Sequence, residues 1–116
     1  MRANLRRACV PFLASVFAVA LAQAPAGPAD GITVMTFNLR YNNPGDGPNA
    51  WPLRKEMAAS TVRFHKADVV GMQEALRGQI SDLEALLPGY AWFGVGRDDG
   101  KDAGEFNPVF YARDRL

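Results

Sequence analysis

The sequence has very few residues of two chemically reactive types, with one cysteine and one histidine. Cys9 lies in an N-terminal apolar segment that we expect to be removed from the mature chain. A mature chain without cysteine can form no disulfide and has no thiol nucleophile, which excludes disulfide scaffolds and thiol enzymes. The single histidine, His65, lies near the end of a predicted helix, where a cation is favourable, and we interpret it as a surface residue rather than a catalyst.

A surplus of positive charge is also missing. The 13 basic and 12 acidic side chains give a net charge of +1. Arg2, Arg6 and Arg7 stand at the extreme N-terminus, so residues 23–116 hold 10 basic and 12 acidic side chains, a net charge of −2. Strong electrostatic binders of nucleic acid carry a basic surplus, which argues against that class. A phosphate-bearing substrate held by local charges stays open.

The N-terminal apolar run is too short for a membrane span. It covers residues 8–22, about 15 residues where a span needs about 20. The arginines before it and Ala20-Leu21-Ala22 at its end predict a signal peptide over residues 1–22, cut after Ala22, with a retained N-terminal anchor as the alternative. We therefore expect a secreted or periplasmic protein without a stable membrane span after cleavage, and no defined protein partner. A proline- and glycine-rich linker is predicted over 23–31.

The remaining residues alternate between strand and helix patterns. We predict strands over 32–41, 69–75, 90–96 and 109–113, and helices over 52–66 and 79–87. This order predicts an α/β fold. Apolar residues on both faces of the first strand indicate that the sheet is covered on both sides. The predicted inward faces are Leu53, Met57, Ser60 or Thr61 and Phe64 on the first helix, and Ile80, Leu83 and Leu87 on the second.

Two polar residues follow apolar strand segments and are candidates for chemistry. Asn38 ends the first strand pattern and Glu74 ends the second. Ligands of parallel α/β sheets gather at the carboxyl ends of the strands, and an amide with a carboxylate suits a hard divalent cation. The alternative is purely structural: Glu74 caps the following helix and Asn38 opens a turn.

A charged loop over 97–107 holds further candidates. Arg97 could bind a phosphate oxygen through its planar guanidinium, or it could pair with Asp98 or Asp99 in a solvated loop. Glu105 could be a second carboxylate or a turn residue. Outside this loop, we interpret Trp51 as a packing anchor and Arg54 as a surface charge on the first helix, and the Asn, Pro, Gly and Asp content of residues 42–48 predicts a loop. The sequence has no glycine-rich phosphate loop, no histidine-based zinc motif and no nucleophile elbow.

Five motifs occur in one order along the chain: TFNLR at 36–40, WPLR at 51–54, DVVGMQE at 68–74, GRDDG at 96–100 and GEFNPVFY at 104–111. This series resembles the endonuclease/exonuclease/phosphatase superfamily, and most of all its secreted bacterial metal-dependent hydrolases. The resemblance covers about residues 32–116. It implies that this stretch is the N-terminal portion of a four-layer α/β sandwich, in which two packed sheets are flanked by helices.

The resemblance also implies roles for site residues. Asn38 would lie in the catalytic pocket, and Glu74 would bind Mg²⁺ or Mn²⁺ with Asn38 as a further metal ligand. Arg97 would face the substrate, and Gln73 and Glu105 would support the site. The general base and the remaining metal and phosphate ligands of the family come from the second half of the domain, which this sequence does not contain.

The implied function is hydrolysis of a phosphoester by a metal-dependent enzyme of the phosphodiesterase, phosphatase or nuclease type. The substrate would be a small molecule, a lipid head group or a nucleic acid, and the net charge of −2 favours the first two. We expect this chain to be an incomplete, truncated part of such a domain and inactive by itself. The alternative is a non-catalytic exported α/β remnant or binding fragment.

Overall fold

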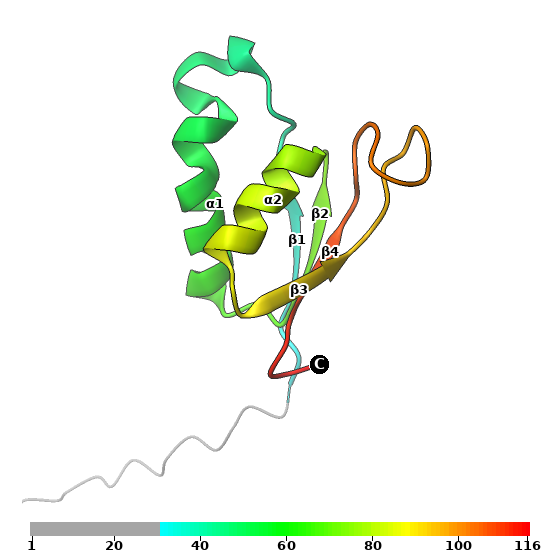
Figure 1. Cartoon of the computed structure of the whole chain (residues 1–116). Helices are drawn as coiled ribbons and strands as arrows, with labels where there is room; N and C mark the ends of the chain where they lie inside the picture. Colours follow the sequence, from blue (N-terminus) through cyan, green and yellow to red (C-terminus); the bar gives the residue numbers. More distant parts are fainter. Residues whose placement is uncertain (1–30) are drawn as a thin grey trace, which may run out of the picture.

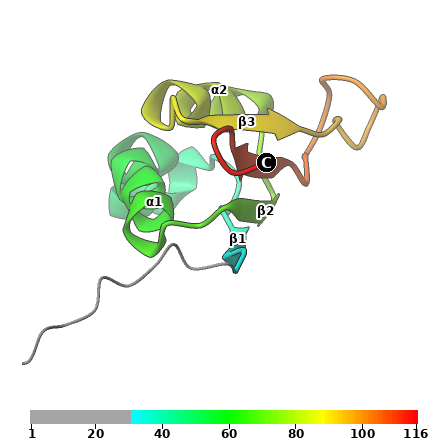
Figure 2. The same cartoon turned by 90° about the horizontal axis from the view of Figure 1, so that it is seen from below.

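Residues 31–116 form a four-stranded sheet with two helices on one of its faces (Figures 1 and 2). These are the residues that the computed structural model describes. The predicted signal peptide over 1–22, and the predicted linker over 23–31 apart from Gly31, lie outside the described residues. Within residues 31–116, no helix has the length and apolar character needed to cross a membrane.

The elements follow the predicted order, with shorter strands. They are β1 (Val34–Asn38), the 3-10 segment η1 (Pro44–Asn49), α1 (Trp51–His65), β2 (Val69–Gln73), α2 (Arg77–Leu86), β3 (Tyr90–Phe93) and β4 (Val109–Ala112). The sheet order is β1-β2-β4-β3. β1 and β2 are parallel, whereas β4 runs antiparallel to both β2 and β3. The α/β class is therefore confirmed, and the sheet is mixed.

The core lies between the sheet and the helices. Val70 and Met72 of β2 alternate with less buried neighbours, so their side chains face the helices, as does Phe110 of β4. From the helix side, α2 contributes Ile80 and Leu83, both fully buried. Leu87, just after α2, is 1% exposed, so the predicted inward face of this second helix is confirmed.

The predicted inward face of the first helix is wrong. Leu53, Met57 and Phe64 are 72%, 63% and 81% exposed, and Ser60 is exposed while Thr61 is half-buried. The buried residues of α1 are instead Trp51, Ala58, Ala59 and Val62. The small side chains of Ala58 and Ala59 let the helix lie close to its neighbours. The prediction was wrong because it was based on the larger apolar residues, which point outward.

The second face of the sheet has no helix on it within the described residues. Val34 of β1 is 71% exposed and Phe93 of β3 is 62% exposed. The Phe93 ring lies 6.4 Å from the ring of Tyr111 on β4, so the apolar surface continues across this side of the sheet. The sequence predicted cover on both sides, and residues 31–116 supply it on one. The four-layer sandwich therefore stays a prediction.

Candidate active site

Asn38 and Glu74 meet at one edge of the sheet, as predicted. The register pairs Asn38 with Gln73 across the parallel strands β1 and β2, and Glu74 follows directly. The Asn38 Nδ2 donates to the Glu74 Oε1 at 2.9 Å. The Asn38 Oδ1 accepts from the Arg40 N–H at 2.8 Å. Asn38 therefore does open a turn, and the group that it directs toward Glu74 is a donor.

Both strand ends have an unusual backbone conformation. Glu74 has a φ of 58° and Arg40 has a φ of 55°. Residues other than glycine rarely adopt this left-handed region, because the Cβ then lies too close to the following carbonyl oxygen. Such conformations persist where the surroundings fix them, and they gather at functional sites. Just after Glu74, the segment around Phe106 fixes the backbone, because Ala75 and Phe106 exchange hydrogen bonds at 3.2 and 2.7 Å.

The helix-cap alternative for Glu74 does not describe this geometry. The side chain that caps the start of α2 is Gln79, whose Oε1 accepts from the Leu76 N–H at 3.0 Å. This is one half of a capping box, in which a residue of the first turn reaches back to the N-cap backbone. Glu74 lies before that turn and contacts Asn38, so its carboxylate does not cap the start of the helix.

Gln73 lies next to Glu74, but its side chain forms hydrogen bonds with residues of β1 and β2. Its Nε2 donates to the Gly71 carbonyl at 3.0 Å and to the Thr36 hydroxyl at 3.3 Å. The contact with Thr36 ties β2 to β1 just before the two strand ends. The predicted support of the site by Gln73 stays a prediction.

Arg97 and Glu105 form an ion pair in the loop between β3 and β4. The Arg97 guanidinium lies 3.2 Å from Glu105 and 3.1 Å from Asp98. The hydrogen bond to Asp98, with the charge of Glu105, raises the pKa of Arg97. The sequence left open that Arg97 pairs with Asp98 or Asp99 in a solvated loop, and the pair with Asp98 is present. Phe106 bridges to both Ala75 and Gly96, which brings this loop beside the segment after Glu74. No ion pair or hydrogen bond among residues 31–116 joins Arg97 to Asn38 or Glu74.

A second arginine lies near the strand ends and was not among the predicted site residues. Arg40 makes two hydrogen bonds to Asp46, both at 3.1 Å, and its guanidinium lies 4.5 Å from the centre of the Tyr41 ring. The hydrogen bond to Asp46 raises the pKa of Arg40, and the charge of Glu74 acts in the same direction. The same hydrogen bond lowers the pKa of Asp46. Asp46 belongs to η1, a segment whose proline and glycine content predicted only a loop.

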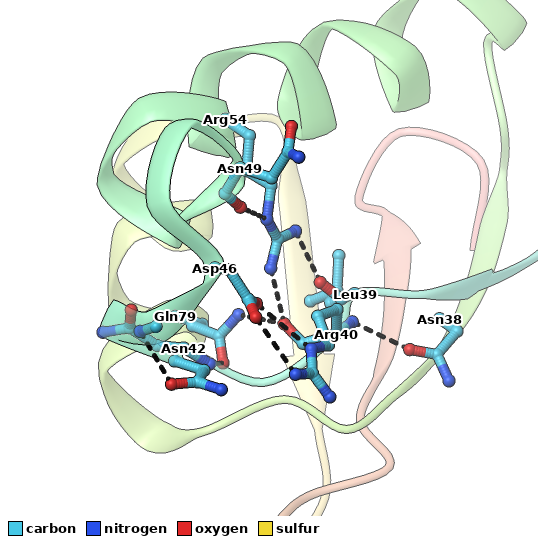
Figure 3. A network of polar contacts seen from close by, with 10 residues as sticks. Asn38, Leu39, Arg40, Asn42, Asp46, Asn49, Arg54 and Gln79 are labelled. Carbon is cyan, nitrogen blue, oxygen red and sulfur yellow. Dashed lines mark hydrogen bonds and ion pairs between the residues drawn. The ribbon is translucent and has the colours of Figure 1, made fainter.

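Arg54 was interpreted as a surface charge on the first helix, and the structure corrects this. Its guanidinium donates to the backbone carbonyls of Leu39, Arg40 and Asn49 (Figure 3). It also lies 5.1 Å from the centre of the Trp51 ring. Trp51 itself is 2% exposed, which confirms the predicted packing anchor. Arg54 therefore holds the loop after β1 in place.

The residues at the strand ends fit a magnesium site in which the protein supplies few of the ligands. Within residues 31–116, no group of three or more His, Cys, Asp and Glu side chains could hold a metal ion. Mg²⁺, however, commonly keeps several waters and binds through one or two carboxylates together with substrate phosphates. The half-buried Glu74 carboxylate can supply one such ligand. The Asn38 oxygen is already bonded to the Arg40 N–H, so in this arrangement Asn38 supports the carboxylate.

Solved structures resemble this chain closely. An endonuclease/exonuclease/phosphatase from Bacteroides vulgatus is 53% identical, with a TM-score of 0.67 over 68% of this chain. The chain belongs to the endonuclease/exonuclease/phosphatase family. A mannosyl-6-phosphatase of this fold from Bacteroides thetaiotaomicron is 42% identical, with a TM-score of 0.70 over 72% of the chain. No protein-family model and no curated protein matches the chain.

The family likeness covers part of these longer proteins. The chain spans 30% of the Bacteroides vulgatus protein and 32% of the mannosyl-6-phosphatase. A humanized D. rerio TDP2 is 21% identical, with a TM-score of 0.57 over 72% of this chain and 31% of its own, which shows a common fold alone. The predicted membership of the superfamily is confirmed, together with the α/β fold that the superfamily implies.

Proposed function

We propose that this chain contributes to a metal-dependent phosphoester hydrolase and that Glu74 supplies a carboxylate ligand for Mg²⁺ or Mn²⁺. The observation that carries the proposal is the contact of Asn38 with Glu74 across the ends of two parallel strands, at 2.9 Å. A bound divalent cation supplies positive charge that stabilises a phosphate undergoing hydrolysis. The 42% identity to a mannosyl-6-phosphatase supports the same class of reaction.

The other residues receive roles around that carboxylate. Asn38 orients Glu74 by donating to one of its oxygens and leaves the second oxygen for a ligand. Gln73 keeps the two strand ends in register. Arg97, whose side chain is 65% exposed, would bind a substrate phosphate oxygen, and Glu105 would orient the guanidinium until the substrate arrives. The general base would come from residues beyond this sequence.

For the substrate we propose a small or lipid-linked phosphoester. The net charge of −2 over residues 23–116 gives no long-range attraction for a nucleic-acid backbone. Two arginines near the site are held by carboxylates, Arg40 by Asp46 and Arg97 by Glu105. Such pairs suit a single phosphate group better than an extended polyanion. A nuclease is the second candidate within the same chemistry.

We also propose export to the periplasm or the medium, because residues 1–22 have the charge and apolar pattern of a signal peptide. Amino-terminal sequencing of the protein recovered from the periplasm or the medium is expected to begin at Gln23. A product that keeps Met1 or stays in the membrane fraction would instead favour a retained anchor.

A chimera tests the proposed activity. Residues 32–116 replace the aligned segment of the Bacteroides thetaiotaomicron mannosyl-6-phosphatase, and hydrolysis of a mannosyl-6-phosphate substrate is measured with and without added Mg²⁺. We expect metal-dependent hydrolysis, and a loss of at least about 100-fold in kcat for Glu74→Gln, since a lost ligand weakens charge stabilisation in the transition state. Glu56→Gln, the same change at an exposed residue of α1, is the matched control and is expected to leave kcat unchanged.

Two outcomes would contradict the proposal. A folded chimera without activity at saturating metal would favour the alternative, a non-catalytic exported remnant or binding fragment. A Glu74→Gln chimera within a few-fold of the parent would show that the carboxylate is not a metal ligand.

A further inference from the structure

A single buried side chain connects the two loops that follow β1 and β2. Gln79, in the first turn of α2, is 1% exposed. Its Oε1 accepts from the N–H groups of Asn42 and Leu76, each at 3.0 Å, and its Nε2 donates to the Arg40 carbonyl at 3.0 Å. Figure 3 shows Gln79 beside Asn42 and the loop that carries Arg40. An amide suits this position, because it carries a donor nitrogen and an acceptor oxygen with two lone pairs at one end.

Two of the three partners of Gln79 lie two residues from a member of the candidate site. Arg40 follows Asn38 by two positions, and Leu76 follows Glu74 by two positions. The loop after β1 is therefore tied to the start of α2 through one side chain. A shift of either segment would change the distance between Asn38 and Glu74.

Arg54 acts on the same carbonyl from the other side. Its Nη2 donates to the Arg40 oxygen at 2.7 Å, so this oxygen accepts from both Arg54 and Gln79 (Figure 3). Both acceptor positions of the carbonyl are then used. A carbonyl held from two directions fixes the peptide plane, which explains how Arg40 keeps its left-handed conformation. That conformation brings the Arg40 N–H to the Asn38 Oδ1.

We propose that Gln79 is a positioning residue of this site: its buried amide fixes the loop after β1 against the start of α2, so that Asn38 meets Glu74. This inference rests on the proposed role of Glu74 as a metal ligand. Gln79 does not contact the carboxylate. It acts through the Arg40 carbonyl and the turn at Asn38, and Arg54 assists it.

The test uses the full chain, with Mn²⁺ as the probe and Gln79→Met as the main variant. Methionine fills a similar volume and makes none of the three hydrogen bonds. Paramagnetic broadening of amide signals near Glu74 reports Mn²⁺ affinity, and hydrogen exchange of the Asn38 side-chain amide reports its contact with Glu74. The matched control is Ile80→Val, a neighbouring residue of α2 with no exposure, which loses stability through packing alone.

For Gln79→Met we expect about a 10-fold or greater loss of Mn²⁺ affinity, the range seen when outer partners of a metal ligand are lost. We expect faster exchange of the Asn38 amide as well. Ile80→Val is expected to leave both readouts within about twofold of the parent chain, because a packing change on α2 leaves the ligand's outer partners in place. In an Asn38→Ala background, Gln79→Met is expected to cause no further loss of affinity, because the two residues act through the same contact.

Unchanged Mn²⁺ affinity and unchanged Asn38 exchange in folded Gln79→Met would overturn the inference, as would additive losses with Asn38→Ala. If Gln79→Met does not fold, Gln79→Glu replaces it, since the carboxylate keeps both acceptor contacts and removes the donor to Arg40. A parent chain that binds no Mn²⁺ near Glu74 would contradict the proposed function. The exchange of the Asn38 amide would still decide the role of Gln79.

Discussion

β2 has an acidic residue directly before it and another directly after it, and the two have different surroundings. Asp68, at the start, is 8% exposed and accepts from the Thr33 N–H at 2.7 Å and from the Arg115 Nε at 3.0 Å. Glu74, at the end, is half-buried and accepts from the Asn38 Nδ2. The backbone is left-handed at Glu74, with a φ of 58°. Both oxygens of the Asp68 carboxylate accept a hydrogen bond, whereas among the described residues only one oxygen of Glu74 does.

This difference separates a stabilising carboxylate from one that can bind a ligand. The Thr33 N–H, followed by Arg115, lowers the pKa of Asp68, so folding favours its ionised form. Asp68 thereby ties the start of β1 and the C-terminal residues to β2. Glu74 has a single link of this kind, to Asn38 at the end of β1, and its strained backbone costs stability. A residue that costs stability at a strand end is a candidate for function.

The largest effect that we expect is on metal binding. Glu74→Gln should weaken Mn²⁺ binding by at least about 100-fold, because a neutral amide is a much poorer ligand for a hard cation than a carboxylate. Asp68→Asn should leave the affinity within about twofold, since Asp68 lies at the opposite end of β2 and its oxygens are bonded. Titration of each variant with Mn²⁺, followed by paramagnetic broadening, checks both. Equal losses in the two variants would mean that the ion binds the surface without preference.

The second effect concerns stability in acid and should appear at Asp68. Because the pKa of Asp68 is lower in the folded chain, the stabilisation is complete above the usual value of about 3.9 and is lost as the pH falls through the folded value. Asp68→Asn should lower the melting temperature at pH 7 by several degrees and flatten its decline below pH 4. Asp46, Asp82 and Asp99 also have lowered pKa values, so part of the decline should remain.

Thermal unfolding between pH 2.5 and 7 measures this second effect. Asp114→Asn, the same change at an exposed position, is the control and should reproduce the parent curve. A parent-like acid decline in Asp68→Asn would contradict the role given to the Thr33 and Arg115 contacts.

Two arginines, Arg115 beside Asp68 and Arg97 in the loop between β3 and β4, should differ in the same way, with smaller effects on stability and activity. Arg115 pairs with the buried Asp68, whereas Arg97 pairs with Glu105 and Asp98 on an exposed loop. Exposed pairs contribute little to stability, so Arg97→Met should leave the melting temperature unchanged. In the chimera it should lower kcat/KM by about 10- to 100-fold, the usual range for a lost hydrogen bond to a charged group. Arg115→Met should do the reverse, lowering the melting temperature and leaving kcat/KM unchanged. Reduced activity in both would remove the distinction.

The sequence predicted that Asn38 and Glu74 stand where two strands end, because strand formation follows from local rules, although the strands themselves are shorter than predicted. Runs rich in β-branched and apolar residues located β1 and β2, and parallel pairing brings Asn38 and Glu74 to one edge. It did not predict Gln79 or Arg54, because their partners are backbone carbonyls and N–H groups of loops, and no side-chain spacing reports them. The exposed face of α1 was missed for a related reason. Large apolar residues dominate a pattern, while Ala58 and Ala59 make the contact.

The smallest effect concerns backbone strain, which occurs before and after β2. Lys66 ends α1 in the left-handed region, with a φ of 49°, and its N–H bonds to the Arg63 carbonyl. This is the position at which glycine commonly ends a helix. Left-handed strain costs about 1–2 kcal/mol, and glycine loses about 0.5–1 kcal/mol in backbone entropy. Lys66→Gly should therefore stabilise the chain by roughly 0.5–1 kcal/mol in urea unfolding and leave Mn²⁺ affinity unchanged. Glu74→Gly relieves the same strain but removes the carboxylate, so any gain in stability there should come with loss of metal binding. A Lys66→Gly chain that is less stable than the parent would show that the helix end carries no strain to relieve, and left-handed φ values would then not mark the end of β2 as costly either.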